Sequence, residues 1–187
     1  MQDRITTERL TLRALDPDRD VERLHAMCAD FDVARMTGSF AHPFSRFHAE
    51  AMIFLANARV SAGRDAVFAV DDGGGLVGTI GGHARPDGSV EIGYALARDA
   101  WGRGYATEAV QGLVRWAKAR FTPDRFVACV FADNPASEAV LHKAGFARTD
   151  GACTGWSMAR LAKAPIRTFT RHVERKAAAD GAMALSA

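Results

Sequence analysis

The stretch over positions 90–109 constrains the fold most, because its periodicity changes across two glycines. Apolar residues alternate with polar or small ones over 90–96, which predicts a β-strand. From position 106 apolar residues recur at helical spacing, at positions 106, 109, 110, 113, 114 and 117. Gly102 and Gly104 lie between the two patterns. The stretch therefore predicts a strand, a tight loop and a helix.

The predicted helix lacks a good N-cap. The residues before it are Gly102, Arg103, Gly104 and Tyr105, where Ser, Asp or Asn would be favoured. The first helical amides, those of Arg103 to Thr107, are therefore free to bind an external anion. The positive end of the helix dipole and the Arg103 side chain both favour negative charge there. The sequence predicts a phosphate-binding loop.

Spacing separates this loop from two common nucleotide-binding motifs. A P-loop requires G-x-x-x-x-G-K-[ST], and the chain contains no such run. A dinucleotide fingerprint requires a third glycine where the chain has Thr107, and the residues upstream are typical of hairpins instead of a βαβ unit. The spacing therefore disfavours a domain that binds ATP or NAD.

Length and composition predict one domain. A chain of 187 residues with 48% hydrophobic residues suits a single core, and we expect one domain over 1–175. The segment 176–187 carries little bulk to bury, so we expect a flexible tail. Monomer and dimer both stay open.

Charge and cysteine content exclude several function classes. A net charge of +2 gives no reason to expect a nucleic acid or a membrane surface as partner. The polar start lacks an apolar leader segment, so we expect a cytoplasmic location. Three widely spaced cysteines match no zinc or disulfide framework, and we expect no metal.

The remaining elements follow from local patterns. We expect strands over 9–15, 66–70, 76–82 and 126–131, helices over 17–28, 45–61, 106–120 and 134–145, and weaker strands over 146–150 and 155–163, with 165–173 extending or flanking the last. In the helix over 45–61 we assign the apolar stripe to Phe47, Ala51, Ile53 or Phe54, and Ala58. Asn134 and Gly145 fit the two ends of the fourth helix.

Two motifs carry a family resemblance. The run W-G-R-G-Y-A-T-E-A at 101–109 resembles the pyrophosphate loop of the GNAT acyl-CoA N-acetyltransferases, especially the branch of ribosomal-protein N-terminal acetyltransferases. Gly104 and Ala106 match the broader pattern [QR]-x-x-G-x-[GA], whereas Trp101 replaces Gln or Arg, as in that branch. The run N-P-A-S-E-A-V-L-H-K-A-G-F at 134–146 is similar to the GNAT element N-x-x-S-x-x-x-x-x-K-x-G-F. With the strand R-L-T-L-R at 9–13, the resemblance reaches to about position 160.

This resemblance implies a fold and a reaction. The fold is α/β (α+β), with a mixed, mostly antiparallel twisted sheet of six to seven strands, about four helices and a V-shaped splay between strands 4 and 5. The reaction is acetyl transfer from acetyl-CoA to a primary amine by direct attack in a ternary complex, first of all to a protein N-terminal α-amine. A small-molecule amine as acceptor, or a non-catalytic acyl-CoA sensor, are the alternatives.

The reaction requires two roles for protons, and the resemblance suggests a residue for one of them. A protonated amine must lose a proton before it attacks, and the departing thiolate needs a hydrogen-bond donor. We predict Glu91, on the strand beside the acyl-CoA site, as the base, directly or through water. The resemblance implies Ser137 as the donor. The simpler interpretation of Glu91 is an exposed strand residue, and that of Ser137 is a serine merely tolerated in the first turn of a helix.

The resemblance also implies a cofactor site. The backbone of Leu96 and Ala97 would bind the pantetheine arm. Asn134 and Lys143 would also contact the cofactor, although Asn134 has a simpler role as an N-cap and Lys143 as a solvent-exposed residue. Phe40, His83 and Trp156 are candidates for lining the acceptor pocket. The predicted cofactor-binding residues are Leu96, Ala97, Trp101, Gly102, Arg103, Gly104, Tyr105, Ala106, Thr107, Asn134 and Lys143.

Overall fold

A computed structural model describes residues 4–61, 63 and 65–173, with 150 and 152 described by their backbone alone. The tail expected over 176–187 lies outside the described residues. In chain order the elements are β1 (Ile5–Thr6), β2 (Thr11–Arg13), α1 (Pro17–Ala29), α2 (Phe31–Ala34), α3 (Arg46–Ser61), β3 (Asp65–Asp71), β4 (Leu76–Ala84), β5 (Val90–Leu96), a 3-10 turn (Arg98–Ala100), α4 (Tyr105–Phe121), β6 (Arg125–Phe131), α5 (Pro135–Lys143), β7 (Ala147–Ser157) and β8 (Ala162–His172).

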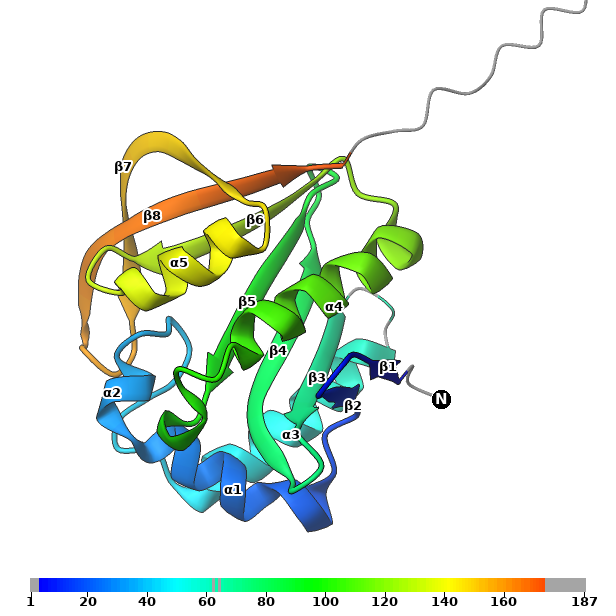
Figure 1. Cartoon of the computed structure of the whole chain (residues 1–187). Helices are drawn as coiled ribbons and strands as arrows, with labels where there is room; N and C mark the ends of the chain where they lie inside the picture. The colour runs from blue at the N-terminus through cyan, green and yellow to red at the C-terminus, as the bar shows by residue number, and fades with distance from the viewer. Residues whose placement is uncertain (1–3, 62, 64, 174–187) are drawn as a thin grey trace, which may run out of the picture.

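The described strands form one sheet in the order β1-β2-β3-β4-β5-β6-β8-β7 (Figure 1). Among them β5 and β6 are the one parallel pair. This confirms the mixed, mostly antiparallel sheet. The structure also contains two short elements that the sequence did not predict, β1 and α2, because they are too short to give a periodic pattern. The strand predicted over 155–163 is interrupted, since positions 155–157 end β7 and positions 162–163 begin β8. Between them the chain turns, with Leu161 at a φ of 51°.

The predicted splay lies between β5 and β6. The register pairs Val90 with Phe126 and Glu91 with Val127, and the two strands separate beyond Glu91 (Figure 1). On its other edge β6 pairs with β8 over its whole length, from Arg125 to Phe131. The carboxyl-terminal half of β5 therefore faces an opening in the sheet, into which a strand-like ligand would fit.

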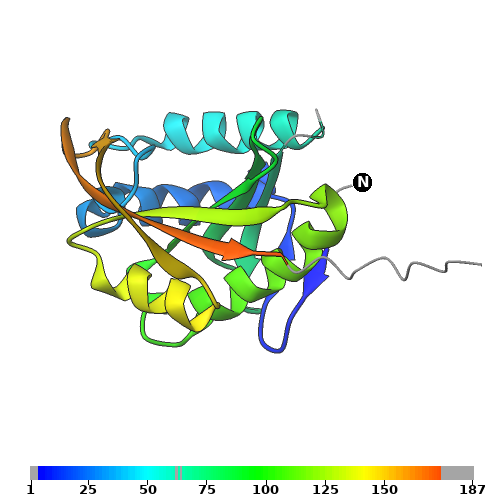
Figure 2. The ribbon, with the colours of Figure 1, turned by 90° about the horizontal axis from the view of Figure 1, so that it is seen from above.

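Helices cover both faces of the sheet (Figure 2). Alternation along β5 directs Val90, Ile92 and Leu96 to the cluster that contains the apolar face of α4. Ala95, on the opposite face, packs in a second cluster with residues of α1 and α3. Successive side chains of β5 therefore lie on opposite faces of the sheet, on either side of the opening. Within the described residues, no helix is long and apolar enough to cross a membrane.

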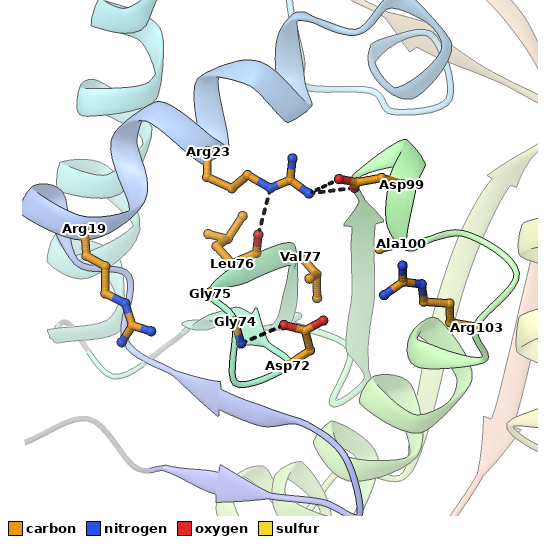
Figure 3. Close-up of a pocket in the computed structure, with 10 residues that line it drawn as sticks. All are labelled: Arg19, Arg23, Asp72, Gly74, Gly75, Leu76, Val77, Asp99, Ala100 and Arg103. Carbon is orange, nitrogen blue, oxygen red and sulfur yellow. Dashed lines mark hydrogen bonds and ion pairs between the residues drawn. The ribbon is translucent and has the colours of Figure 1, made fainter.

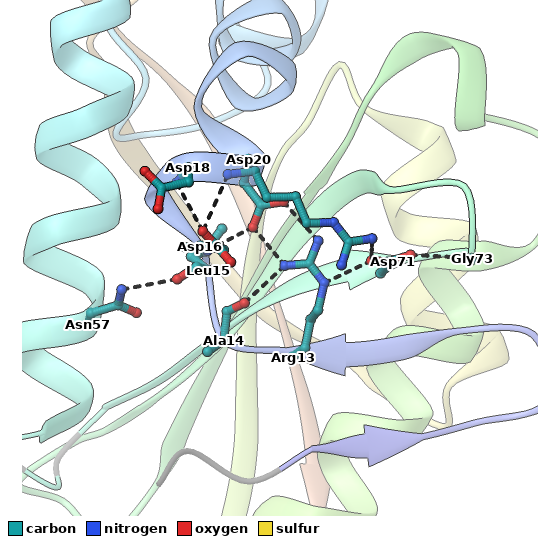
Figure 4. A network of polar contacts seen from close by, with 10 residues as sticks. Arg13, Ala14, Leu15, Asp16, Asp18, Asp20, Asn57, Asp71 and Gly73 are labelled. Carbon is teal, nitrogen blue, oxygen red and sulfur yellow. Dashed lines mark hydrogen bonds and ion pairs between the residues drawn. The ribbon is translucent and has the colours of Figure 1, made fainter.

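A buried ion network fixes α1 to the sheet (Figure 4). Arg13 of β2 donates two hydrogen bonds to Asp20 of α1, at 2.7 and 2.8 Å, and one to Asp71 of β3, at 2.8 Å. Asp20 is 1% exposed and also accepts from the Asp16 amide. Arg13 therefore links three elements, which favours one placement of α1 beneath the β3–β4 hairpin.

Candidate active site

The loop between β5 and α4 has the geometry of an anion cradle. Gly102 and Gly104 have φ values of 74° and 79°, in the left-handed region that glycine adopts without strain. Gly104 is the N-cap of α4, and in the described part of the chain no side chain caps this helix. The first amides of α4 are therefore left for a ligand, as the sequence predicts.

The turn between β1 and β2 contacts this loop and the first turn of α4. Glu108 accepts hydrogen bonds from the Arg9 amide at 2.7 Å, Arg9 Nε at 2.8 Å and Thr7 Oγ1 at 2.6 Å. Arg9 Nη1 donates to the Arg103 carbonyl at 2.9 Å, and its guanidinium lies 5.0 Å from the centre of the Tyr105 ring. The sequence did not reveal this support, because the partners lie about a hundred residues apart.

Trp101 and the end of β5 hold the loop from the other side. Trp101 Nε1 donates to the Leu96 carbonyl at 2.9 Å. The Ala97 amide donates to the Val77 carbonyl, and the Ala97 carbonyl accepts from the Ala100 amide. The Ala97 amide is therefore already paired within the protein, and binding of pantetheine by the Ala97 backbone stays a prediction. Alternation along β5 leaves the Leu96 amide directed toward the splay.

Arg103 borders a cavity of about 450 Å³ on the side of the loop that faces α1 (Figure 3). Arg23 lies across this cavity, where its guanidinium binds the Asp99 carboxylate at 2.6 and 2.7 Å and the Leu76 carbonyl at 3.1 Å. Arg19 lines the same cavity and is paired with Asp71. The charge of Arg103 thus adds to the field around the cradle from outside the splay.

Ser137 lies in the first turn of α5, held at its backbone and at its side chain. Asn134 is the N-cap, and its Oδ1 accepts from the Ser137 amide at 3.1 Å. The Tyr94 hydroxyl lies 2.7 Å from Ser137 Oγ and donates to the Ser137 carbonyl at 3.2 Å. Tyr94 thus joins β5 to α5 across the splay. No local sequence pattern marks this contact, because the two residues lie 43 positions apart.

Glu91 lies where β5 and β6 begin to separate, on the face of β5 opposite Tyr94. Its side chain is 39% exposed, with Arg85 Nε 3.7 Å away. Two residues on, a Cβ at Gly93 would meet none of the described atoms within 4 Å. His83 is the β4 partner of Glu91, and its Nδ1 lies 3.0 Å from Asp65 Oδ1. The structure thus brings Glu91 and His83 together beside open space.

Three other predicted residues lie apart from this centre. Lys143 is exposed at the end of α5, where its carbonyl accepts from Gln111 Nε2 at 3.2 Å. Trp156 is 52% exposed on β7. Phe40 is 6% exposed and packs against Phe44, with ring centres 6.0 Å apart. Phe40 therefore packs in the core, and its role in lining an acceptor pocket stays a prediction.

These features together fit a ligand that is strand-like at one end and phosphorylated at the other. The open edge of β5 leads from Glu91 to the Leu96 amide and then to the uncapped start of α4 at Gly104. The pantetheine arm and the pyrophosphate of acetyl-CoA have this order. The residues present therefore fit the group that the loop resemblance implies.

Comparison with known proteins gives the family. Residues 9–147 match the model described as an acetyltransferase (GNAT) domain. An uncharacterised N-acetyltransferase of Bacillus subtilis (strain 168), YoaA, is 32% identical over 146 residues, which cover 76% of this chain and 81% of the relative.

Solved structures show the same fold. RimL, a ribosomal L7/L12 alpha-N-protein acetyltransferase in complex with coenzyme A, is 19% identical with a TM-score of 0.80, covering 91% of this chain and 98% of that chain. A spermidine N-acetyltransferase from Vibrio cholerae is 19% identical with a TM-score of 0.71, covering 88% and 95%. The family match covers both motifs noted in the sequence. The chain therefore belongs to the GNAT family and is an acetyl-CoA-dependent N-acetyltransferase.

Proposed function

We propose that the chain transfers an acetyl group from acetyl-CoA to a primary amine by direct attack, with a protein N-terminal α-amine as the first candidate acceptor. The observation that carries the proposal is the splay, which has Glu91 on one face, Ser137 beside the other and the Gly104 cradle at its open end. An amine can approach from one face while the thiolate departs toward the other.

Glu91 is the proposed base. Acetyl-CoA supplies a thioester, and an ammonium group must give up two protons in all as the C–N bond forms and the C–S bond breaks. One passes to the Glu91 carboxylate, directly or through water, and the other ends on the thiol. The exposed position of Glu91 beside Gly93 leaves room for an acceptor and for a bridging water.

Ser137 is the proposed partner of the departing sulfur. Its hydroxyl donates a hydrogen bond to the thiolate, and hydrogen bonds to ionised groups are roughly twice as strong as neutral ones. Asn134 holds the Ser137 backbone in place through the helix cap. On β5, the strand that carries Glu91, the Leu96 amide is directed into the splay. It is the proposed donor to the substrate carbonyl or to pantetheine.

The acceptor class rests on likeness to other proteins. RimL is named for an α-amine of a ribosomal protein, and three further structural neighbours are described as acetyltransferases of ribosomal proteins. The likeness to a spermidine N-acetyltransferase supports a small amine as the second candidate. A cytoplasmic location and a monomeric or dimeric state stay predictions.

The test is a thiol-release assay with acetyl-CoA against short peptides with free α-amines, polyamines, aminoglycosides and amino acids. The proposal expects turnover with peptides and a loss of roughly 100-fold or more in Glu91→Gln. Glu50→Gln, which removes an exposed carboxylate from α3, is the matched control and should keep full activity. Turnover with one small amine alone would show that this amine, and not a protein N-terminus, is the acceptor. Binding of acetyl-CoA without turnover of any amine would support the sensor.

A further inference from the structure

The contact between Tyr94 and Ser137 crosses the opening in the sheet. Tyr94 lies three residues beyond Glu91, the last position at which β5 pairs with β6. Its hydroxyl is 2.7 Å from Ser137 Oγ and 3.2 Å from the Ser137 carbonyl oxygen. The ring packs against the cluster that includes Val110 and Leu141, so the hydroxyl is held by a fixed aromatic body.

This contact restricts the Ser137 side chain more than a helix alone would. A serine in the first turn of a helix has a hydroxyl that rotates freely and often bonds to nearby backbone groups. Here the Ser137 backbone is fixed by Asn134 Oδ1, and the side-chain oxygen is fixed by Tyr94 Oη. Both oxygens of Ser137 lie within reach of the same phenol.

The phenol is a donor that keeps its proton. Burial raises the pKa of Tyr94 to about 12, although the hydrogen bond with Ser137 opposes this rise. Tyr94 therefore keeps its proton near neutral pH. The phenol has one proton, and two acceptors lie within its reach, Ser137 Oγ at 2.7 Å and the Ser137 carbonyl at 3.2 Å. Donation over the shorter distance, to Oγ, leaves the serine proton for another acceptor.

We propose that Tyr94 is a positioning residue for acetyl transfer, which donates to Ser137 Oγ so that the serine hydroxyl points its own proton at the departing sulfur. The inference rests on the proposed function. No proton leaves Tyr94. When the C–S bond breaks and its electron pair moves to sulfur, Ser137 donates to the thiolate and Tyr94 strengthens that donor through the linked hydrogen bond.

A double-mutant cycle tests the proposal. Tyr94→Phe keeps the ring and removes only the hydroxyl, and it should lower kcat roughly tenfold with little change in the Kd for acetyl-CoA. Ser137→Ala should lower kcat further, and the double variant should be no slower than Ser137→Ala. A purely structural role for the phenol would instead slow the Ser137→Ala enzyme by the same factor as the wild type. That additive result would overturn the proposal.

Two further measurements separate the possible failures. Thr79→Val removes a buried hydroxyl on the opposite face of the sheet and should leave kcat unchanged, which controls for loss of a buried polar group. The pH profile of Tyr94→Phe should keep the wild-type shape, and loss of its alkaline limb would show a proton-transfer role instead. Wild-type turnover that Tyr94→Phe does not alter refutes this inference alone, whereas no turnover by the wild type refutes the proposed function.

Discussion

An aspartate at Gly104 would place a negative charge where the pyrophosphate of coenzyme A is expected to bind. Gly104 has a φ of 79°, in the left-handed region that Asn and Asp tolerate better than other side chains. A Cβ there would lie 3.4 Å from Arg9 Nη2, at the end of a long, half-exposed side chain. Gly104→Asn has nearly the same shape without the charge and is therefore the matched control.

The magnitude follows from the position of the charge. An aspartate at the N-cap would stand about 5 Å from a phosphate bound to the first amides of α4, and Coulomb's law then gives roughly 1–3 kcal/mol of repulsion for effective dielectric constants between about 80 and 20. The Kd for coenzyme A should therefore be roughly 5- to 150-fold weaker in Gly104→Asp than in Gly104→Asn.

Isothermal titration calorimetry with coenzyme A at low and high salt measures this difference. The ratio of the two Kd values should shrink as salt rises, because exposed charges are screened. The same pair of substitutions at Gly63, which has a φ of 79° and lies at the opposite end of the sheet, should leave both Kd values unchanged. Equal affinities of Gly104→Asp and Gly104→Asn would refute the placement of the pyrophosphate at this helix.

Three further predictions concern the rest of the molecule. Asp20→Ala removes the buried, bidentate partner of the partly exposed Arg13 and should cost about 3–5 kcal/mol of unfolding free energy in urea titrations, and a loss under 1 kcal/mol would contradict it. Burial would raise the pKa of Asp71, but hydrogen bonds from Arg13 and from the Gly73 amide outweigh it and lower the pKa. The stability this carboxylate contributes is therefore present above about pH 4 and lost below it, so Asp71→Asn should flatten the acid limb of a stability-against-pH curve. Burial raises the pKa of Cys28 to about 12, so two of the three thiols should react with Ellman's reagent at pH 8 and Cys28 only after unfolding, and a third fast thiol would count against the structure.

The sequence predicted those features of the site that depend on local chain geometry. Alternation over 90–96, the two glycines and the absence of a capping side chain all act within a few residues, and the structure has the strand, the left-handed turns and the uncapped helix at Gly104. The capping role of Asn134 follows for the same reason. Local chemistry was enough here because backbone conformation is set locally.

Contacts between distant segments were not predictable in this way. Glu108 pairs with Arg9 and Tyr94 with Ser137 only because the fold brings separate elements together, and no periodic pattern marks either pair. Glu108 of α4 and Tyr94 of β5 thus have partners that the sequence alone does not identify.

Helix α3 shows a second limit of pattern reading. The structure buries Ala49, Ile53 and Ala56, whereas Phe47 and Phe54 are each 73% exposed. Of the stripe assigned from the sequence, only the Ile53 option is correct. Both faces of this helix carry apolar residues, so spacing alone could not tell the buried face from the exposed one.

The most direct test of the account compares Ser137→Ala with the wild type in two measurements, turnover of the best amine and affinity for acetyl-CoA. The substitution leaves the Ser137 amide in the helix cap and removes only the hydroxyl. We predict a fall in kcat of roughly 100-fold with a Kd for acetyl-CoA within about twofold of the wild type. Wild-type turnover by Ser137→Ala would contradict it.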